Sequence, residues 1–196
     1  PEHDWLLEYG PFDEETLRTL PEERWTLLVQ DVEKHYPPLQ ALLAHFDFLP
    51  SWRIDDLMVS VAAPGGSVGP HVDQHDVFLL QAAGKRLWQI AEDADGALLP
   101  DTELNVLESF EPEQEWILEP GDMLYLPPGV PHHGVALDSG MTWSFGMRAP
   151  STSDVLLGLG EWLADMRSEG RRYSDPDLET GEGAEVSAAA IDRFAA

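Results

Sequence analysis

Two glycine-rich stretches carry the residues whose chemistry is most distinctive. The first, residues 65–73, ends in His71-Val72-Asp73, and the second, residues 121–132, ends in His132 after a proline-rich loop. Alternate side chains of a strand share a face, so His71 and Asp73 can point to one place. Two histidines and one carboxylate form the facial triad that holds Fe(II) and leaves three positions open. The spacing therefore predicts a metal site at His71, Asp73 and His132, although an isolated His-x-Asp is common and is a weak signal alone.

Arg86 is the candidate for binding an anion beside this metal. Strand alternation over residues 86–90 puts Arg86, Trp88 and Ile90 on one face. If Trp88 and Ile90 face the interior, Arg86 does too, and a guanidinium there needs an anionic partner. A dicarboxylate is suitable because arginine binds carboxylates through two parallel hydrogen bonds. An internal salt bridge to Asp or Glu is the alternative.

Short apolar runs punctuated by glycine and proline predict the strands that must position these side chains. They occupy residues 57–62, 76–81, 86–91, 115–118, 123–126, 134–137 and 141–147. Many short strands with frequent turn signals are typical of a sandwich, barrel or jelly roll. We therefore expect a mainly β catalytic core over residues 51–150.

Helical patterns flank this core. Apolar residues at helical spacing predict a helix over 22–36 that ends at Pro37-Pro38, and a second short helix over 39–46. We expect residues 1–50 to form a helical segment packed on the barrel. After Pro150, a helix capped near Ser153-Asp154 and a helical pattern over 185–196 are predicted, with an acidic loop over 174–183 between them. Residues 151–196 thus read as the start of a helical region.

The composition excludes several function classes. Thirty-seven acidic residues against eleven basic ones leave a formal charge of −26, which argues against direct binding to nucleic acid. Such a surface either suits high salt or steers a basic partner. The chain has no cysteine, hence no disulfide framework or thiolate metal site, as suits a cytoplasmic protein. Its apolar runs are too short to span a membrane.

Both motifs resemble those of the cupin superfamily. The spacing of Gly121, Pro127, Gly129 and His132 resembles the second cupin motif and selects His132 over the adjacent His133. The spacing of Gly65, His71 and Asp73 resembles the first motif, where Val77 stands at about the place of a further glutamate ligand. A bidentate small molecule would fill that vacancy. His75 shares the strand parity of His71 and is either a residue facing the substrate or a partly exposed imidazole.

Nearly the whole chain resembles the bacterial JmjC-type ribosomal oxygenases. The resemblance rests on Trp52 to Met58, Pro64-Gly65-Gly66, Gly69 to Gln74, Asp76-Val77-Phe78, Glu119 to Asp122, Pro127 to His132, Arg148-Ala149-Pro150 and Tyr173 to Asp177. It implies a double-stranded β-helix and a 2-oxoglutarate-dependent dioxygenase that uses Fe(II) and O2. Such enzymes hydroxylate an arginine side chain of large-subunit ribosomal protein L-sixteen.

Carried over residue by residue, the resemblance makes His71, Asp73 and His132 the iron ligands and Arg86 the anchor of the 2-oxoglutarate C5 carboxylate. Family members continue into a helical dimerisation region and a winged-helix domain, which implies a homodimer for a full-length protein. A cationic arginine substrate needs anionic residues near it, and Asp55 and Asp56 are our candidates. The alternative interpretation, with equal weight, is that both are solvated carboxylates of a turn. The basic ribosomal protein would be the partner.

Three alternatives stay open. A related JmjC hydroxylase would act on histidine or lysine, a metallocupin would not use 2-oxoglutarate, and a cupin-like binding module would need no metal ligands for its activity.

Overall fold

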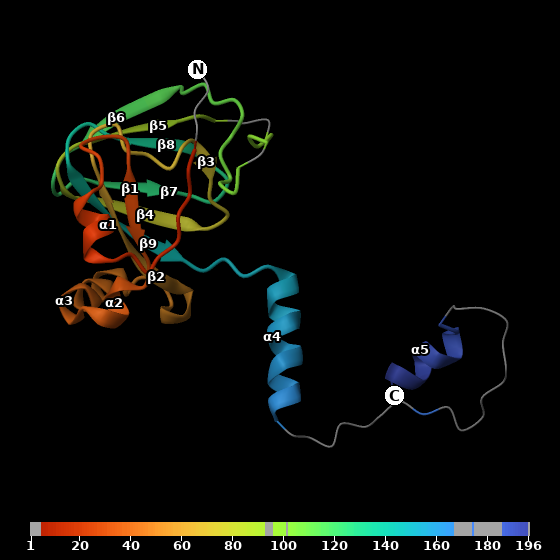
Figure 1. Ribbon diagram of the computed structural model, residues 1–196. Helices are drawn as coiled ribbons and strands as arrows, with labels where there is room; N and C mark the ends of the chain where they lie inside the picture. Colours follow the sequence, from red (N-terminus) through yellow and green to blue (C-terminus); the bar gives the residue numbers. More distant parts are fainter. Residues whose placement is uncertain (1–4, 93–95, 101, 167–173, 175–185, 196) are drawn as a thin grey trace. The chain divides into compact units, whose positions relative to one another are not determined.

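Two antiparallel sheets carry the strands of this protein in a computed structural model that describes residues 5–92, 96–100, 102–166, 174 and 186–195 (Figure 1). The larger sheet has the order β1-β2-β9-β4-β7, with bounds Thr26–Val29, Ile54–Ala62, Gly140–Met147, Asp76–Ala83 and Met123–Leu126. The smaller sheet has the order β3-β8-β5-β6, with bounds His71–Val72, Pro131–Ala136, Arg86–Ile90 and Gln114–Leu118. Each sheet is hydrogen-bonded separately, so the described strands do not close into one barrel.

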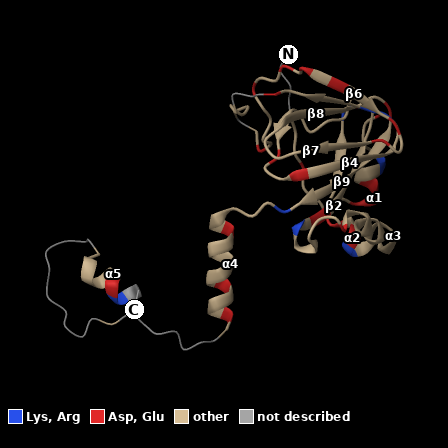
Figure 2. Ribbon diagram, turned by 180° about the vertical axis from the view of Figure 1, so that it is seen from behind, with Lys and Arg blue, Asp and Glu red and all other residues tan. Residues whose placement is uncertain are grey.

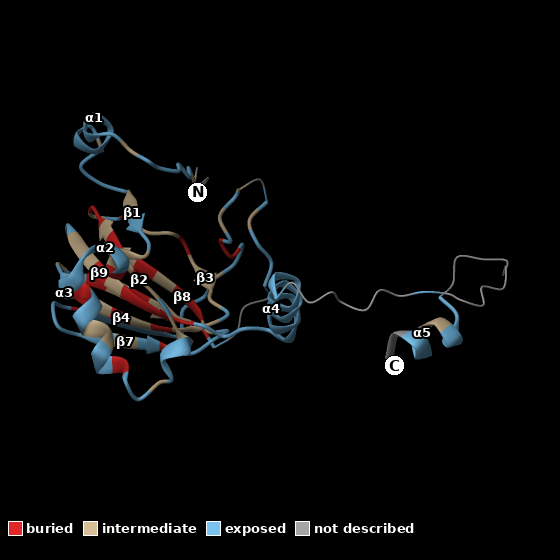
Figure 3. Ribbon diagram, turned by 90° about the horizontal axis from the view of Figure 1, so that it is seen from below, coloured by how far each residue is buried: buried red, intermediate tan, exposed pale blue. Residues whose placement is uncertain are grey.

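The core lies on both faces of the larger sheet, one cluster between the two sheets and the other under the helices. Strand alternation buries Val77 and Leu79 of β4 together with Trp88 of β5. A second cluster joins Leu57 and Phe145 of the larger sheet to residues of the helices that precede it. Figure 3 shows the buried residues concentrated in the strands. The two sheets are thus rigid supports for the side chains they carry.

Short helices lead into the first long strand. They are α1 Glu14–Arg18, α2 Val32–His35, α3 Pro37–Gln40, and the 3₁₀ turns η1 Ala41–Phe46 and η2 Ser51–Arg53. Leu39 and Phe46 are the buried residues that attach this segment to the larger sheet. The short helix predicted over 39–46 corresponds to the end of α3 and to η1, and Pro37 begins α3 in the position that proline favours.

The helix predicted over 22–36 is wrong. Residues Thr26–Val29 form strand β1, which pairs antiparallel with β2 from Thr26 opposite Ala62 to Val29 opposite Val59. Pairing with the edge of β2 satisfies backbone groups that would otherwise lack partners there. Only α2, at the end of the predicted range, is helical. Residues 1–50 therefore contribute a strand to the sheet and are not a purely helical segment.

The strands predicted from sequence are all present, with β8 beginning three residues earlier than expected at Pro131. β3 is an additional strand of two residues that the sequence patterns do not indicate. None of the helices in the described part of the chain combines the length and the apolar character needed to cross a membrane.

The chain divides into two compact units, Pro1–Ala149 and Pro150–Ala196. In the second unit, α4 Thr152–Asp165 is capped by Ser151, two residues before the predicted cap. The Ser151 side chain accepts a hydrogen bond from the Asp154 amide, and Asp154 accepts one from the Ser151 amide in return, which is a capping box. α5 spans Ala188–Ala195. The loop predicted over 174–183 lies outside the described residues except for Ser174.

Candidate functional site

Strands β3 and β8 bring two of the predicted ligands face to face. His71 and His132 are direct partners in the antiparallel register, and their ring centroids lie 4.2 Å apart. Opposite residues of an antiparallel pair have neighbouring side chains on one face. The short strand β3 thus joins two motifs that are far apart in the sequence.

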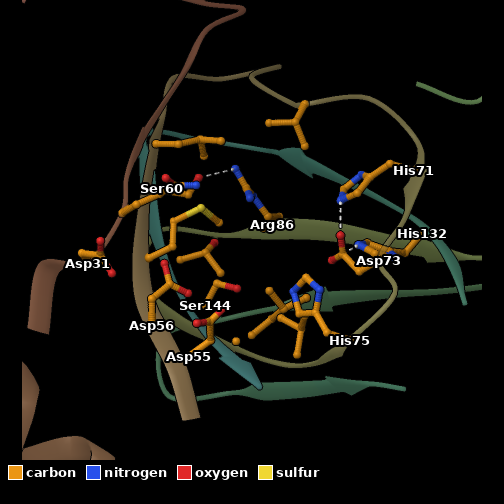
Figure 4. A pocket seen from close by; sticks show the side chains of 18 of the residues that line it. Asp31, Asp55, Asp56, Ser60, His71, Asp73, His75, Arg86, His132 and Ser144 are labelled. Carbon is orange, nitrogen blue, oxygen red and sulfur yellow. Dashed lines mark hydrogen bonds and ion pairs between the residues drawn. The ribbon is translucent and has the colours of Figure 1, made fainter. Parts of the chain in front are cut away.

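Asp73 follows β3 and completes the cluster (Figure 4). Its Oδ1 lies 3.9 Å from His71 Nε2, and its Oδ2 lies 3.6 Å from His132 Nε2. One ligand atom from each of the three residues lies within 4.8 Å of the other two. The Asp73 carbonyl also accepts a hydrogen bond from the Gly129 amide at 2.8 Å, which ties it to the loop before β8.

Backbone carbonyls orient both imidazoles. His71 Nδ1 lies 3.0 Å from the Gly69 carbonyl oxygen, and His132 Nδ1 lies 2.9 Å from the Val130 carbonyl oxygen. A carbonyl only accepts, so Nδ1 carries the proton and Nε2 keeps a free lone pair. Both lone pairs are therefore available beside the Asp73 carboxylate. Two imidazoles and one carboxylate fit a divalent transition-metal ion.

Burial keeps His132 in the form that binds metals. Only 2% of its surface is exposed, and burial, followed by the charge of His71, lowers its pKa to about 4. A metal ligand must be unprotonated. His132 meets that condition at neutral pH without any metal present.

Arg86 is a buried cation in the same region. It is 7% exposed, and burial lowers its pKa to about 10. The guanidinium donates to Ser60 Oγ at 3.4 Å and lies 5.6 Å from the centroid of the Trp88 ring. The ion pairs found within the described residues do not include Arg86, so the salt bridge considered from sequence is absent there. Its inward orientation beside Trp88 is as predicted.

A cavity of about 610 Å³ joins these groups. Figure 4 shows His71, Asp73 and His132 on one side, Arg86 between the sheets, and Asp31, Asp55 and Asp56 on the other side. Ser60 and Ser144 line the space between. The cavity thus has a cationic point, a cluster of metal-binding side chains and an acidic end.

The two predicted substrate carboxylates both line this cavity but differ in environment. Asp56 is half-buried; its pKa is raised, first by burial, while a hydrogen bond from the Asp31 backbone partly offsets the rise. Asp55 forms a largely exposed ion pair with Arg148 at 2.8 Å. Asp56 is therefore the carboxylate better placed for an incoming cation.

Of the two other histidines near the site, one lines the cavity and the other does not. His75 lines the cavity, whereas His133 lies on the opposite face of β8 from His132, with its ring centroid 6.0 Å from that of Phe110.

Sequence reasoning missed the residues that line the cavity from the segment before η1 and from strands without a motif. They include Leu28, Gln30, Asp31, Lys34, Ser60 and Ser144. No spacing signal marks them, because their role depends on which strands become neighbours.

Known proteins resemble this chain in sequence. The family described as JmjC domain matches residues 41–155. The chain is 44% identical over 175 residues to the ribosomal protein uL16 3-hydroxylase of Escherichia coli (strain K12). The aligned residues cover 89% of this chain and 46% of that protein. The chain is 39% identical over 182 residues to a probable ribosomal oxygenase of Haemophilus influenzae, covering 91% of this chain and 43% of that protein.

A solved structure agrees with these matches. The structure of YcfD, a ribosomal oxygenase from Escherichia coli, in complex with cobalt and 2-oxoglutarate superposes with a TM-score of 0.78 at 41% identity. The match covers 100% of this chain and 51% of that chain. This chain spans about half the length of the curated relatives it matches. The resemblance to ribosomal oxygenases and the mainly β JmjC fold expected from sequence are confirmed.

Proposed function

Because this chain belongs to the JmjC domain family, we propose that it is an Fe(II)- and 2-oxoglutarate-dependent oxygenase that hydroxylates an arginine side chain of a large-subunit ribosomal protein. The observation that carries this proposal is the buried guanidinium of Arg86 in the same cavity as His71, Asp73 and His132. A buried cation without a carboxylate partner favours an anionic ligand from outside.

The proposal gives each of these side chains a task. His71, Asp73 and His132 would hold the iron, and Arg86 with Ser60 would bind the far carboxylate of 2-oxoglutarate. When bound, iron and 2-oxoglutarate supply the oxidising chemistry, in which O2 is consumed and 2-oxoglutarate becomes succinate and CO2. The chain itself holds the ligands in place, keeps the His132 imidazole neutral and excludes water from the apolar wall around Trp88.

The acidic end of the cavity supports a cationic substrate. Asp56 and Ser144 line it, so a guanidinium could meet a carboxylate and a hydroxyl there. The name of the Escherichia coli relative, ribosomal protein uL16 3-hydroxylase, supports uL16 as the ribosomal protein concerned. A cytoplasmic location and a homodimer in a full-length protein remain predictions, as does the absence of nucleic-acid and membrane partners.

The test combines two measurements on one reaction. The chain is incubated with Fe(II), 2-oxoglutarate, O2 and fragments of uL16, and both succinate release and fragment mass are followed. We expect succinate and the addition of one oxygen atom on an arginine, and neither with the His132→Ala variant. Oxygen added to a histidine or lysine would replace the arginine assignment by the other JmjC hydroxylase. Absence of succinate would overturn the use of 2-oxoglutarate.

A further inference from the structure

We propose that Glu33 is a positioning residue that aims the Asp56 carboxylate at the substrate. This inference rests on the proposed function, since it assigns the acidic end of the same cavity to a cationic side chain. Glu33 lies before residues 41–155, the segment matched by the JmjC family, and it does not line the cavity itself. It would act through the strand that carries Asp56.

The strand β2 is irregular at the point where the two acidic residues lie. The register between β2 and β9 shifts between Ile54 and Leu57, so Asp55 and Asp56 together face the single residue Gly146. Consecutive residues of a regular strand point to opposite faces, whereas a bulge can turn an extra side chain to the same side. Here both Asp55 and Asp56 line the cavity. The bulge is thus what makes two adjacent carboxylates available to one ligand.

Glu33 holds the far end of this bulge. Its side chain accepts a hydrogen bond from the Leu57 amide, with Oε2 3.0 Å from the nitrogen. Glu33 is 7% exposed, which is unusual for a carboxylate. A buried carboxylate needs hydrogen-bond donors, because burial of an unsatisfied charge is unfavourable. The residue next to Asp56 is therefore fixed by a group from another segment.

The same two segments are joined a second time, in the opposite direction. The Asp31 backbone amide faces the Asp56 carboxylate and lowers its pKa against the larger effect of burial. Asp31 adopts the left-handed conformation with φ 57°, which non-glycine residues rarely adopt. Each segment thus offers a carboxylate to a backbone amide of the other. This reciprocal pair restricts both the backbone and the side chain of Asp56.

Gly146 completes the arrangement from the facing strand. A Cβ atom at this position would lie 3.0 Å from Asp56 Oδ1 and 3.9 Å from His75 Nε2. The absence of a side chain leaves the Asp56 carboxylate room to face the cavity, beside an imidazole that also lines it. Glu33 and Gly146 therefore control the same carboxylate from two sides.

The test separates positioning from general stability. In Glu33→Ala, the KM for an arginine-containing uL16 fragment should rise roughly tenfold, the expected scale for a lost hydrogen bond to a charged group. Succinate release in the absence of the fragment should keep its wild-type rate and its wild-type dependence on 2-oxoglutarate. Glu33→Gln retains an oxygen acceptor for the Leu57 amide, so it should restore the KM to within about threefold.

Two further variants keep the result decisive. Gly146→Ala should raise the KM without changing the contact between Glu33 and the Leu57 amide, even if Glu33→Ala fails to fold. Glu14→Gln, which removes an exposed carboxylate paired with Arg18, is the matched charge control and should behave as wild type. An unchanged fragment KM in both Glu33→Ala and Gly146→Ala, or an equal fall in fragment-free succinate release, would overturn the proposal.

Crystal structures of the variants give a readout that needs no turnover. We expect the Asp56 carboxylate to turn away from its wild-type orientation in Glu33→Ala and to keep it in Glu33→Gln. An unmoved carboxylate in Glu33→Ala would contradict the positioning role even if hydroxylation is observed. If no uL16 fragment is hydroxylated by the wild type, the proposed function fails, and the orientation of Asp56 alone decides this inference.

Discussion

At the scale of single residues, the cavity combines ionisable groups whose charge states are set by burial. His132 is held neutral although histidine ordinarily titrates near neutral pH, and Arg86 stays cationic although burial lowers its pKa to about 10. The neutral imidazole suits a metal ion, and the retained cation suits a carboxylate. The two residues therefore divide the cavity into a part for metal and a part for an anion.

Replacing Arg86 tests the anion part. Arg86→Gln removes the charge and keeps a hydrogen-bond donor, so the 2-oxoglutarate concentration for half-maximal succinate release should rise roughly 10- to 100-fold. The matched control is Lys85→Gln, because the neighbouring Lys85 pairs with Glu119 at the surface. That control should leave the half-maximal concentration unchanged. Equal effects of both substitutions would remove Arg86 from the cosubstrate site.

The depressed pKa of His132 predicts how the metal-free protein responds to acid. Between about pH 4 and 6.5, the unfolded chain binds a proton at this histidine and the folded chain does not. The contribution of neutral His132 to the free energy of unfolding is thus fully present above pH 6.5 and is lost as the pH falls. The free energy of unfolding should decrease by up to about 1.4 kcal/mol per pH unit from this group.

Urea unfolding in the presence of a chelator measures this dependence. His132→Gln should show a smaller loss of stability than wild type across that pH range. His45→Gln, which replaces an exposed histidine, should follow the wild type. If His132→Gln and wild type lose stability in parallel, His132 is not the group responsible.

At the scale of the elements, β8 positions the site through its contact with β5. Trp88 packs against Gly134, which lies two residues after His132 on the same strand and opposite Trp88 in the register. This close approach is possible because position 134 has no side chain. The glycine therefore sets how deeply the strand that carries His132 lies against the core.

Gly134→Ala should disturb this packing. A Cβ atom there would lie 2.7 Å from atoms of the Trp88 ring, so we expect a loss of about 1–3 kcal/mol in the free energy of unfolding. Weaker Co(II) binding should accompany it, because His132 lies on the displaced strand. The control is Gly160→Ala in α4, where a Cβ atom meets nothing within 4 Å, and which should be neutral or slightly stabilising. Unchanged stability and Co(II) affinity in Gly134→Ala would contradict the packing role.

The elements also show what the sequence could predict. Strands such as β7 and β9 follow from local patterns of apolar residues between glycines and prolines, and their bounds agree with the structure to within a residue. β1 could not be predicted in this way, because residues 26–29 are extended through pairing with β2, far away in the sequence. Its apolar residues also fit a helical period, and the partner strand decided between the two.

The residues of the candidate site also differ in whether the sequence alone could predict them. His71, Asp73 and His132 could be singled out from spacing, since their residue types match a known ligand set. Arg86 could be oriented from strand alternation alone. Asp31 and Glu33 could not be found, because each contacts Asp56 or its neighbour only after α2 is placed against β2. Contacts between segments without a motif leave no periodic signal.

At the scale of the whole molecule, charge is the dominant property. Figure 2 shows acidic residues on elements of both units and far fewer basic ones. From the formal charge of −26 we expect a field that favours basic proteins over nucleic acid as partners. A basic ribosomal protein that is not yet assembled into the ribosome would be attracted by this field.

The field predicts a dependence on salt. Raising the ionic strength from about 0.01 to 0.15 M shortens the screening length from about 30 to 8 Å, so kcat/KM for a basic uL16 fragment should fall several-fold. Succinate release without a fragment should change much less over the same range and serves as the control. Turnover of the fragment that is independent of ionic strength would leave only salt adaptation to explain the acidic surface.

The position of β1 and α2 has a consequence for how such enzymes diversify. Leu28, Gln30, Asp31 and Lys34 line the cavity, yet all precede the residues matched by the JmjC family. Part of the wall that would meet the substrate is therefore encoded before the stretch that carries His71, Asp73 and His132. We therefore expect exchange of the first forty residues between relatives to change which side chain is accepted while leaving the three predicted metal ligands in place.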